Sequence, residues 1–100
     1  MSYAEHVAAE RRLAILRLMK EDGGQSNDGI LLTAMRAIGH RQEMDTAAIR
    51  QLLRDLQERD CVTIEQVRDT IMVVKLTERG RMAIAGDVSI GGIASPHQGL

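Results

Sequence analysis

The sequence has 100 residues, of which 44% are hydrophobic and 27% charged, and its formal net charge at pH 7 is −1. This balance is typical of one globular domain and differs from that of a disordered chain. The apolar runs fall far short of the ~20 residues that cross a bilayer. The first residues mix charge with alanine and lack the apolar stretch of a secretion signal. We therefore expect a cytoplasmic protein with no membrane segment.

Aromatic and sulfhydryl side chains are scarce. Tyr3 is the only aromatic residue, which disfavours single-strand nucleic-acid binding folds, because these stack bases on aromatic rings. Cys61 is the only cysteine, so neither an intramolecular disulfide nor a cysteine-based metal site is expected. The near-neutral charge gives no general attraction to DNA, and any nucleic-acid binding must depend on local charge.

Two helices are predicted in the first part of the chain. Residues 4–21 are good helix formers, and their larger apolar side chains recur mostly every three or four positions. A run of capping residues at Ser26–Asp28, together with a terminal Gly39, predicts a second helix over about residues 27–38.

The third predicted helix, residues 44–59, begins with Asp45 or Thr46 as its cap and has the clearest periodicity. Its larger apolar residues follow the i, i+3, i+4, i+7 spacing: Ile49, Leu52, Leu53 and Leu56. The opposite arc is mostly polar: Ala47, Arg50, Gln51 and Arg54. We expect the first set in the core and the second set on the surface.

After Asp60 the period changes from 3.6 to 2, which indicates strands. Residues 61–67 alternate, and residues 71–76 are β-branched and apolar, with a short polar stretch at 68–70 between them. This pattern predicts a two-stranded hairpin.

The last predicted helix is capped by Thr77 and ends at Gly86. Residues 87–100 contain several glycines and one proline and show no period. We expect one domain over residues 1–86 and a flexible tail over residues 87–100.

Two segments carry a resemblance to known proteins. The stretch Thr46–Arg59, followed directly by Cys61 and Val62, resembles the recognition helix and first wing strand of winged helix-turn-helix proteins of the ArsR and MarR kind. The sequence Leu-Thr-Glu-Arg-Gly at Leu76–Gly80 resembles the segment that follows the second wing strand in those families.

A closer resemblance is to the small ArsR-like proteins of Mu-like phages and prophages. It is carried by the capping run Ser26–Asp28, the turn Gly39–Arg41, the segment Leu76–Gly80 and a tail that contains glycine and proline. The chain departs from their pattern at Asp60–Cys61, where Gly-Leu is common.

The resemblance implies an α+β winged helix-turn-helix with a three-helix core, a two-stranded wing and a C-terminal helix. The function it implies is binding of double-stranded DNA by a phage- or prophage-type transcriptional regulator in the cytoplasm of a bacterial host, with the helix of residues 44–59 in the major groove.

Candidate DNA contacts are the exposed donors on and beside this helix. Arginine and glutamine suit base edges, and cations and amides suit phosphates. The set comprises Arg41, Gln42, Thr46, Arg50, Gln51, Arg54 and Arg68. Arg41 and Gln42 are placed to reach the DNA backbone. Arg68 at the wing tip is placed to touch a flanking phosphate or the minor groove.

Nearby acidic residues weaken the prediction of strong DNA binding, because Glu43, Asp45 and Asp69 lie beside these donors. Affinity then requires two subunits, and we expect a homodimer that pairs through the last helix and the alanine-rich start of the first helix, Ala4, Ala8 and Ala9. The alternative is a winged-helix adaptor that binds a phage protein in assembly or packaging, without sequence-specific DNA binding.

Enzymatic, metal and cofactor functions find no support in the sequence. No serine has a histidine–acid pair nearby, and no glycine-rich loop precedes Lys-Ser or Lys-Thr. His6, His40 and His97 are scattered, whereas a metal sensor needs clustered ligands. We interpret Cys61 as a structural residue.

Overall fold

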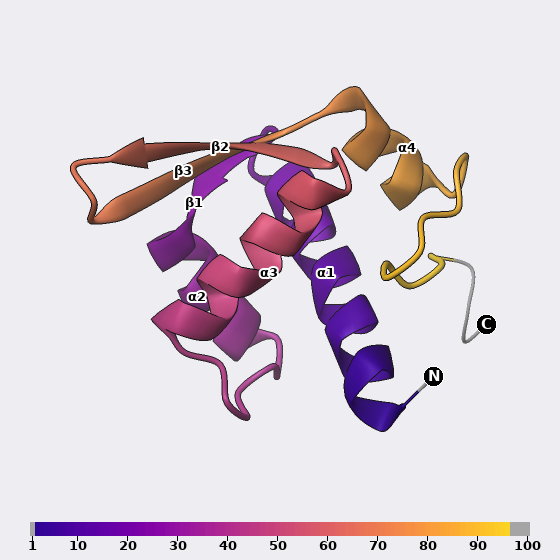
Figure 1. Ribbon diagram of the computed structural model, residues 1–100, viewed down its shortest axis with the longest axis horizontal. Helices are drawn as coiled ribbons and strands as arrows, with labels where there is room; N and C mark the ends of the chain where they lie inside the picture. The colour runs from indigo at the N-terminus through magenta and orange to yellow at the C-terminus, as the bar shows by residue number, and fades with distance from the viewer. Residues whose placement is uncertain (1, 97–100) are drawn as a thin grey trace.

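Helices and strands follow one another in the predicted order, with one strand added. The computed structural model describes residues 2–96, and Figure 1 shows their arrangement. The elements are α1 (Tyr3–Glu21), β1 (Gln25–Asn27), α2 (Asp28–Ala37), α3 (Thr46–Glu58), β2 (Val62–Val67), β3 (Ile71–Leu76) and α4 (Glu78–Ala85). Within the described residues these are four helices and one antiparallel sheet, which confirms the predicted α+β class.

The sheet has a third strand that the sequence patterns did not predict. Its order is β1-β3-β2, and Ser26 of β1 pairs with Val74 of β3. The three residues of β1 are polar and show no alternation, so only pairing with a distant strand makes them extended. Asn27 still serves as the predicted cap, because its side chain accepts a hydrogen bond from the Ile30 backbone at 2.9 Å.

The predicted caps of the later helices are confirmed. The Asp45 carboxylate accepts a hydrogen bond from the Ala48 backbone at 2.8 Å, so α3 begins at Thr46. The Thr77 hydroxyl accepts one from the Gly80 backbone at 3.1 Å and starts α4. Each cap satisfies a backbone N–H that has no partner inside its helix.

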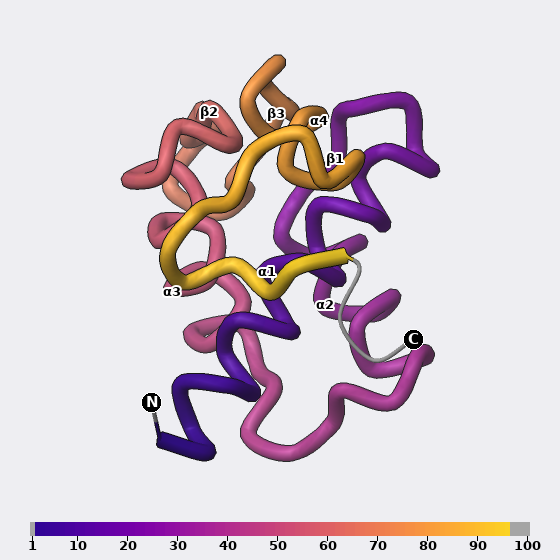
Figure 2. Tube along the Cα trace, turned by 90° about the vertical axis from the view of Figure 1, so that its right-hand side faces the viewer, coloured from indigo at the N-terminus to yellow at the C-terminus, as the bar shows by residue number. Residues whose placement is uncertain are grey.

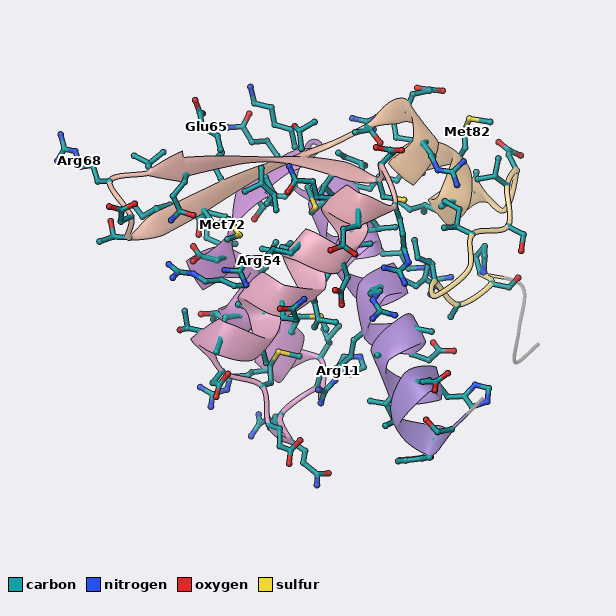
Figure 3. All side chains as sticks on the ribbon, in the orientation of Figure 1. Arg11, Arg54, Glu65, Arg68, Met72 and Met82 are labelled. Atoms are coloured by element: carbon teal, nitrogen blue, oxygen red, sulfur yellow. The ribbon has the colours of Figure 1, made fainter. Side chains whose placement is uncertain are left out.

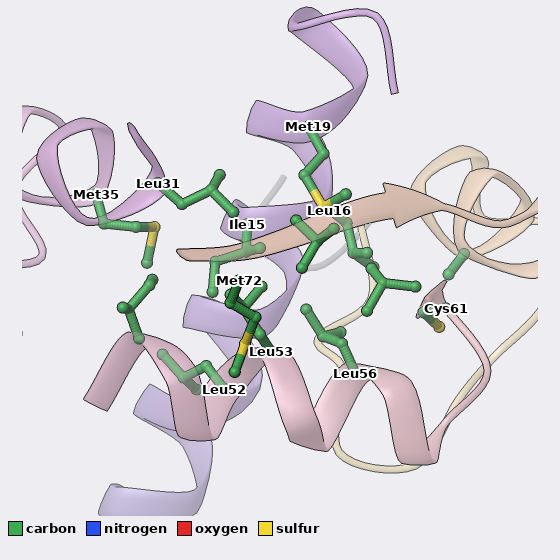
Figure 4. Packing of buried hydrophobic residues seen from close by; sticks show 14 of the residues in the cluster. Ile15, Leu16, Met19, Leu31, Met35, Leu52, Leu53, Leu56, Cys61 and Met72 are labelled. Carbon is green, nitrogen blue, oxygen red and sulfur yellow. The ribbon is translucent and has the colours of Figure 1, made fainter. Parts of the chain in front are cut away.

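The core lies between α1, α2, α3 and the inner face of the sheet (Figure 4). The predicted apolar stripe of α3 is buried, with Ile49, Leu53 and Leu56 fully enclosed. Methionine supplies much of the remaining bulk in this core without phenylalanine or tryptophan, at Met19, Met35, Met44 and Met72.

Residues 87–96 differ from the predicted loose tail. They form no helix or strand, yet Ile90 is only 8% exposed and belongs to the core cluster. The segment crosses α1 in Figure 2, and the Ala94 backbone N–H donates to the Ala9 carbonyl at 3.2 Å. The sequence of this segment shows no periodicity, so its packing against the core could not be predicted from it. The predicted flexibility of residues 97–100 lies outside the described residues.

Candidate nucleic-acid interface

The β2–β3 hairpin projects to one side of α3 and carries Arg68 at its far end (Figure 3). Arg68 and Asp69 adopt φ values of 52° and 57°, and the Thr70 backbone N–H donates to the Val67 carbonyl at 3.2 Å. Two consecutive positive φ angles close a tight turn whose twist matches that of the strands. The turn directs the exposed Arg68 away from the body of the protein.

Arg50 differs from the freely exposed side chain that the sequence predicts. Its Nε donates to the Asp28 carboxylate at 2.7 Å, and its guanidinium also donates to the Thr70 carbonyl at 2.8 Å. The Arg50 side chain is 24% exposed and that of Asp28 is 7% exposed. The position follows the buried Ile49 and lies at the edge of the apolar face. We call Asp28, Arg50 and the Thr70 carbonyl the brace, because they join α2, α3 and the hairpin turn.

Asp28 is a buried carboxylate with several donors around it. Its second oxygen accepts hydrogen bonds from the backbones of Gly29 at 3.0 Å and Met72 at 3.3 Å. Burial alone would raise the pKa of Asp28, but the hydrogen bonds and the positive charge of Arg50 outweigh it and lower the pKa below its ordinary value. Sequence reasoning treated Asp28 only as part of a capping run and missed this role.

The exposed face of α3 presents the other predicted helix donors. Thr46 and Arg54 are exposed, and the Arg54 side chain makes no hydrogen bond or ion pair within residues 2–96. Gln51 is exposed too, although its amide donates to Asp55 at 3.0 Å. Asp55 also pairs with Arg12 of α1 at 2.9 Å. These contacts leave Thr46, Gln51 and Arg54 accessible together on one surface.

The loop between α2 and α3 holds Arg41 and Gln42 at the end of this surface where α3 begins. Both side chains are exposed. Arg41 donates to the Arg36 carbonyl at 3.1 Å, and the Gln42 carbonyl accepts from Arg11 of α1 at 2.7 Å. These contacts tie the middle of the loop to the end of α2 and to α1, while the side chains of Arg41 and Gln42 remain exposed.

A groove of about 830 Å³ lies between α1, this loop and the α1-facing flank of α3. We call it the α1 groove. Its lining residues include Tyr3, Ala4, Val7, Ala8, Glu10, Arg11, Arg12, His40, Arg41, Glu43, Ala48, Leu52 and Asp55. Burial, and next the positive charge of Arg11, lower the pKa of His40 below its ordinary value.

Comparison with known proteins identifies two relatives. The chain is 33% identical over 79 residues to an uncharacterized protein of Haemophilus influenzae, and the aligned segment covers 79% of this chain and 76% of that protein. It is also 33% identical over 87 residues to the uncharacterized protein gp26 of Escherichia phage Mu, and this aligned segment covers 87% of this chain and 88% of gp26. The chain belongs to the gp26 family. The predicted relation to Mu-like phage proteins is thereby confirmed, whereas no family model and no solved structure matches the chain.

Across residues 2–96, none of the helices combines the length and apolar character needed to span a bilayer. In the same part of the chain, histidine, cysteine and acidic side chains form no group of three that suits a metal ion. Cys61 is buried, and burial raises the pKa of its thiol.

Proposed function

We propose that this member of the gp26 family binds double-stranded DNA as a winged helix-turn-helix protein and acts as a phage- or prophage-type transcriptional regulator. In this proposal α2 and α3 are the helix-turn-helix, and the β2–β3 hairpin is the wing. The observation that carries it is the exposed face of α3, with Thr46, Gln51 and Arg54 accessible together, beside a projecting hairpin that ends in Arg68.

The donors divide by the part of DNA that each can meet. An α-helix fits the major groove, where Arg54 and Gln51 have the donors that base edges accept. Arg68 at the hairpin tip suits a flanking phosphate or the minor groove, and Thr46, Arg41 and Gln42 suit the backbone at the start of α3. Arg50 holds the wing turn to α3 through the brace, so we assign it positioning and no direct base contact.

Local acids limit how tightly one copy can bind. Glu58 lies on the exposed side of α3, and Glu43 and Asp69 are exposed beside the proposed phosphate contacts. The Asp45 carboxylate is engaged as the cap of α3. A homodimer that places two α3 helices on one duplex supplies the missing affinity, because each copy adds its own phosphate contacts.

Two arginine substitutions test the assignment by quantitative binding to duplex DNA. Arg54→Ala is expected to cost about 1–3 kcal/mol of binding free energy and to relax base preference at one position. Arg68→Ala is expected to weaken binding to all sequences equally and to lower the salt slope by about one unit. Arg81→Ala is the control, since Arg81 is exposed on α4.

Wild-type binding to duplex DNA that is weak and without base preference would favour the second candidate function, a protein-interaction adaptor in phage assembly or packaging. The near-neutral charge and the α1 groove, with its apolar side chains, are the observations that support it. If Arg54→Ala and Arg68→Ala are folded and bind DNA as the wild type does, α3 and the hairpin are not the DNA-binding surface.

A further inference from the structure

Strand β1 ends before the hairpin beside it does. Its last residue, Asn27, lies opposite Val73 of β3, whereas the hairpin continues to a turn at residues 68–70 (Figure 1). Residues 65–71 are all exposed, so little packing fixes them to the body of the protein. A two-stranded hairpin is at best marginally stable alone. The outer end of this hairpin therefore needs another contact to hold its direction.

Asp28 supplies such a contact from the position where β1 would have continued. In the register of β1 and β3, the residue after Asn27 falls opposite Met72. The backbone turns away there, because α2 begins at Asp28. The Asp28 carboxylate takes the place of a strand carbonyl, since it accepts a hydrogen bond from the Met72 backbone N–H at 3.3 Å. One side chain therefore continues the sheet edge beyond the end of the strand.

Arg50 continues the same edge of β3 toward the turn. Thr70 lies two residues before Met72, and backbone polar groups two residues apart along a strand point to the same edge. The Arg50 guanidinium donates to the Thr70 carbonyl at 2.8 Å and to the Asp28 carboxylate at 2.7 Å. A planar guanidinium holds two such acceptors in fixed directions. Two side chains thus complete the edge that a longer β1 would have paired.

The carboxylate of Asp28 has enough acceptor sites for all of these contacts. Each of its oxygens offers two lone pairs. One oxygen accepts from the backbones of Gly29 and Met72, and the other accepts from Arg50. The start of α2, the edge of β3 and the side chain from α3 therefore meet at a single group that is 7% exposed.

We propose that Asp28 and Arg50 are positioning residues for the wing, because they complete this sheet edge and fix the hairpin tip relative to α3. The consequence for DNA binding rests on the proposed function, in which α3 enters the major groove and Arg68 meets the DNA beside it. Holding two contact points at the spacing that one duplex requires lowers the cost of making both. The contribution of Arg68 to binding then depends on the brace, although Asp28 and Arg50 do not contact DNA.

Residual dipolar couplings of the backbone amides, measured by NMR without DNA, test how the hairpin is held. Arg50→Lys keeps a positive charge beside Asp28, but one ammonium on a shorter side chain does not also reach the Thr70 carbonyl. Asp28→Asn keeps an oxygen for the Met72 N–H and breaks the ion pair, since its amide nitrogen is a donor. In both variants the couplings of residues 65–71 are expected to be smaller than in the wild type, while those of α3 are unchanged.

Asp55→Asn is the matched control. The ion pair of Asp55 with Arg12 is also partly buried and spans 2.9 Å, but it joins α1 to α3 and does not involve the hairpin. Its loss should leave the couplings of residues 65–71 as in the wild type. Unchanged couplings in Arg50→Lys and Asp28→Asn would overturn the inference. An equal decrease in Asp55→Asn would overturn it too, because the hairpin would then respond to any loss of stability.

Salt-dependent binding to duplex DNA tests the link between the brace and the wing contact. In the wild-type background, Arg68→Ala is expected to lower the salt slope by about one unit. In the Arg50→Lys background the same substitution should have little further effect, because the tip no longer holds Arg68 against the duplex. Equal effects in both backgrounds would contradict the link. A protein that binds no DNA, yet loses hairpin couplings in Arg50→Lys and not in Asp55→Asn, would refute the proposed function and uphold the positioning of the hairpin by the brace.

Discussion

Asp28→Ala is expected to lower the free energy of unfolding by about 3–5 kcal/mol, the usual cost of removing one partner from a buried ion pair. The substitution leaves the Arg50 guanidinium, 24% exposed, without its carboxylate, and it also removes the acceptor of the Gly29 and Met72 backbone N–H groups. Urea unfolding at pH 7 measures the effect. Asp22→Ala changes an exposed aspartate at the end of α1 and should shift stability by less than about 0.5 kcal/mol.

The stability difference between the wild type and Asp28→Ala is expected to depend on pH in a defined direction. Burial works to raise the pKa of Asp28, but its hydrogen bonds and the charge of Arg50 lower it below the ordinary value of 3.8. The ionised carboxylate therefore stabilises the fold above the ordinary pKa, and this contribution disappears as the pH falls through the lower pKa of the folded state. The stability difference between wild type and Asp28→Ala should shrink over that acidic range. A difference that stays constant with pH would contradict the brace.

Gly80→Ala is expected to destabilise the protein by about 1–3 kcal/mol through overpacking. A methyl group at this position would overlap the backbone carbonyl oxygen of Cys61 and lie 2.7 Å from a methyl of Leu76. Alanine favours helices over glycine by about 1 kcal/mol, so a destabilisation would have to come from the contact. The segment cannot easily move away, because the Thr77 hydroxyl donates to the Asp60 carbonyl at 2.6 Å.

Thermal unfolding of Gly80→Ala beside Gly91→Ala isolates this contact. Gly91 has open space where a methyl group would lie, so its substitution should leave the melting temperature nearly unchanged. Equal melting temperatures for the two variants would show that Gly80 of α4 does not pack closely against Cys61, the residue before β2. The expected difference explains the glycine in the Leu-Thr-Glu-Arg-Gly segment at Leu76–Gly80.

The elements predicted correctly from the sequence are those with a local pattern. The four-residue stripe of α3 and the caps Asp45 and Thr77 depend on neighbours within one or two turns, and the structure confirms all of them. Strand β1 and the segment around Ile90 gain their places only by pairing or packing with distant parts of the chain. Three polar residues and an aperiodic tail contain no local sign of such partners.

The residues of the candidate site show the same contrast between local patterns and distant partners. Thr46, Gln51 and Arg54 are exposed together as helical periodicity predicts. Arg50 occupies the edge of the same face, where its role depends on Asp28, which lies 22 residues earlier. No spacing rule connects an arginine of one helix with a carboxylate at the start of another, so only the folded structure reveals the brace.

Selection of binding sites from random duplex DNA with the purified protein tests the central claim most directly. If α3 reads the major groove, repeated rounds will enrich one sequence motif, and a two-fold dimer will enrich two copies of it about one helical turn apart. The Arg54→Ala protein will then lose preference at one position of that motif. Recovery of random sequence from the folded wild-type protein would contradict sequence-specific DNA binding by this member of the gp26 family.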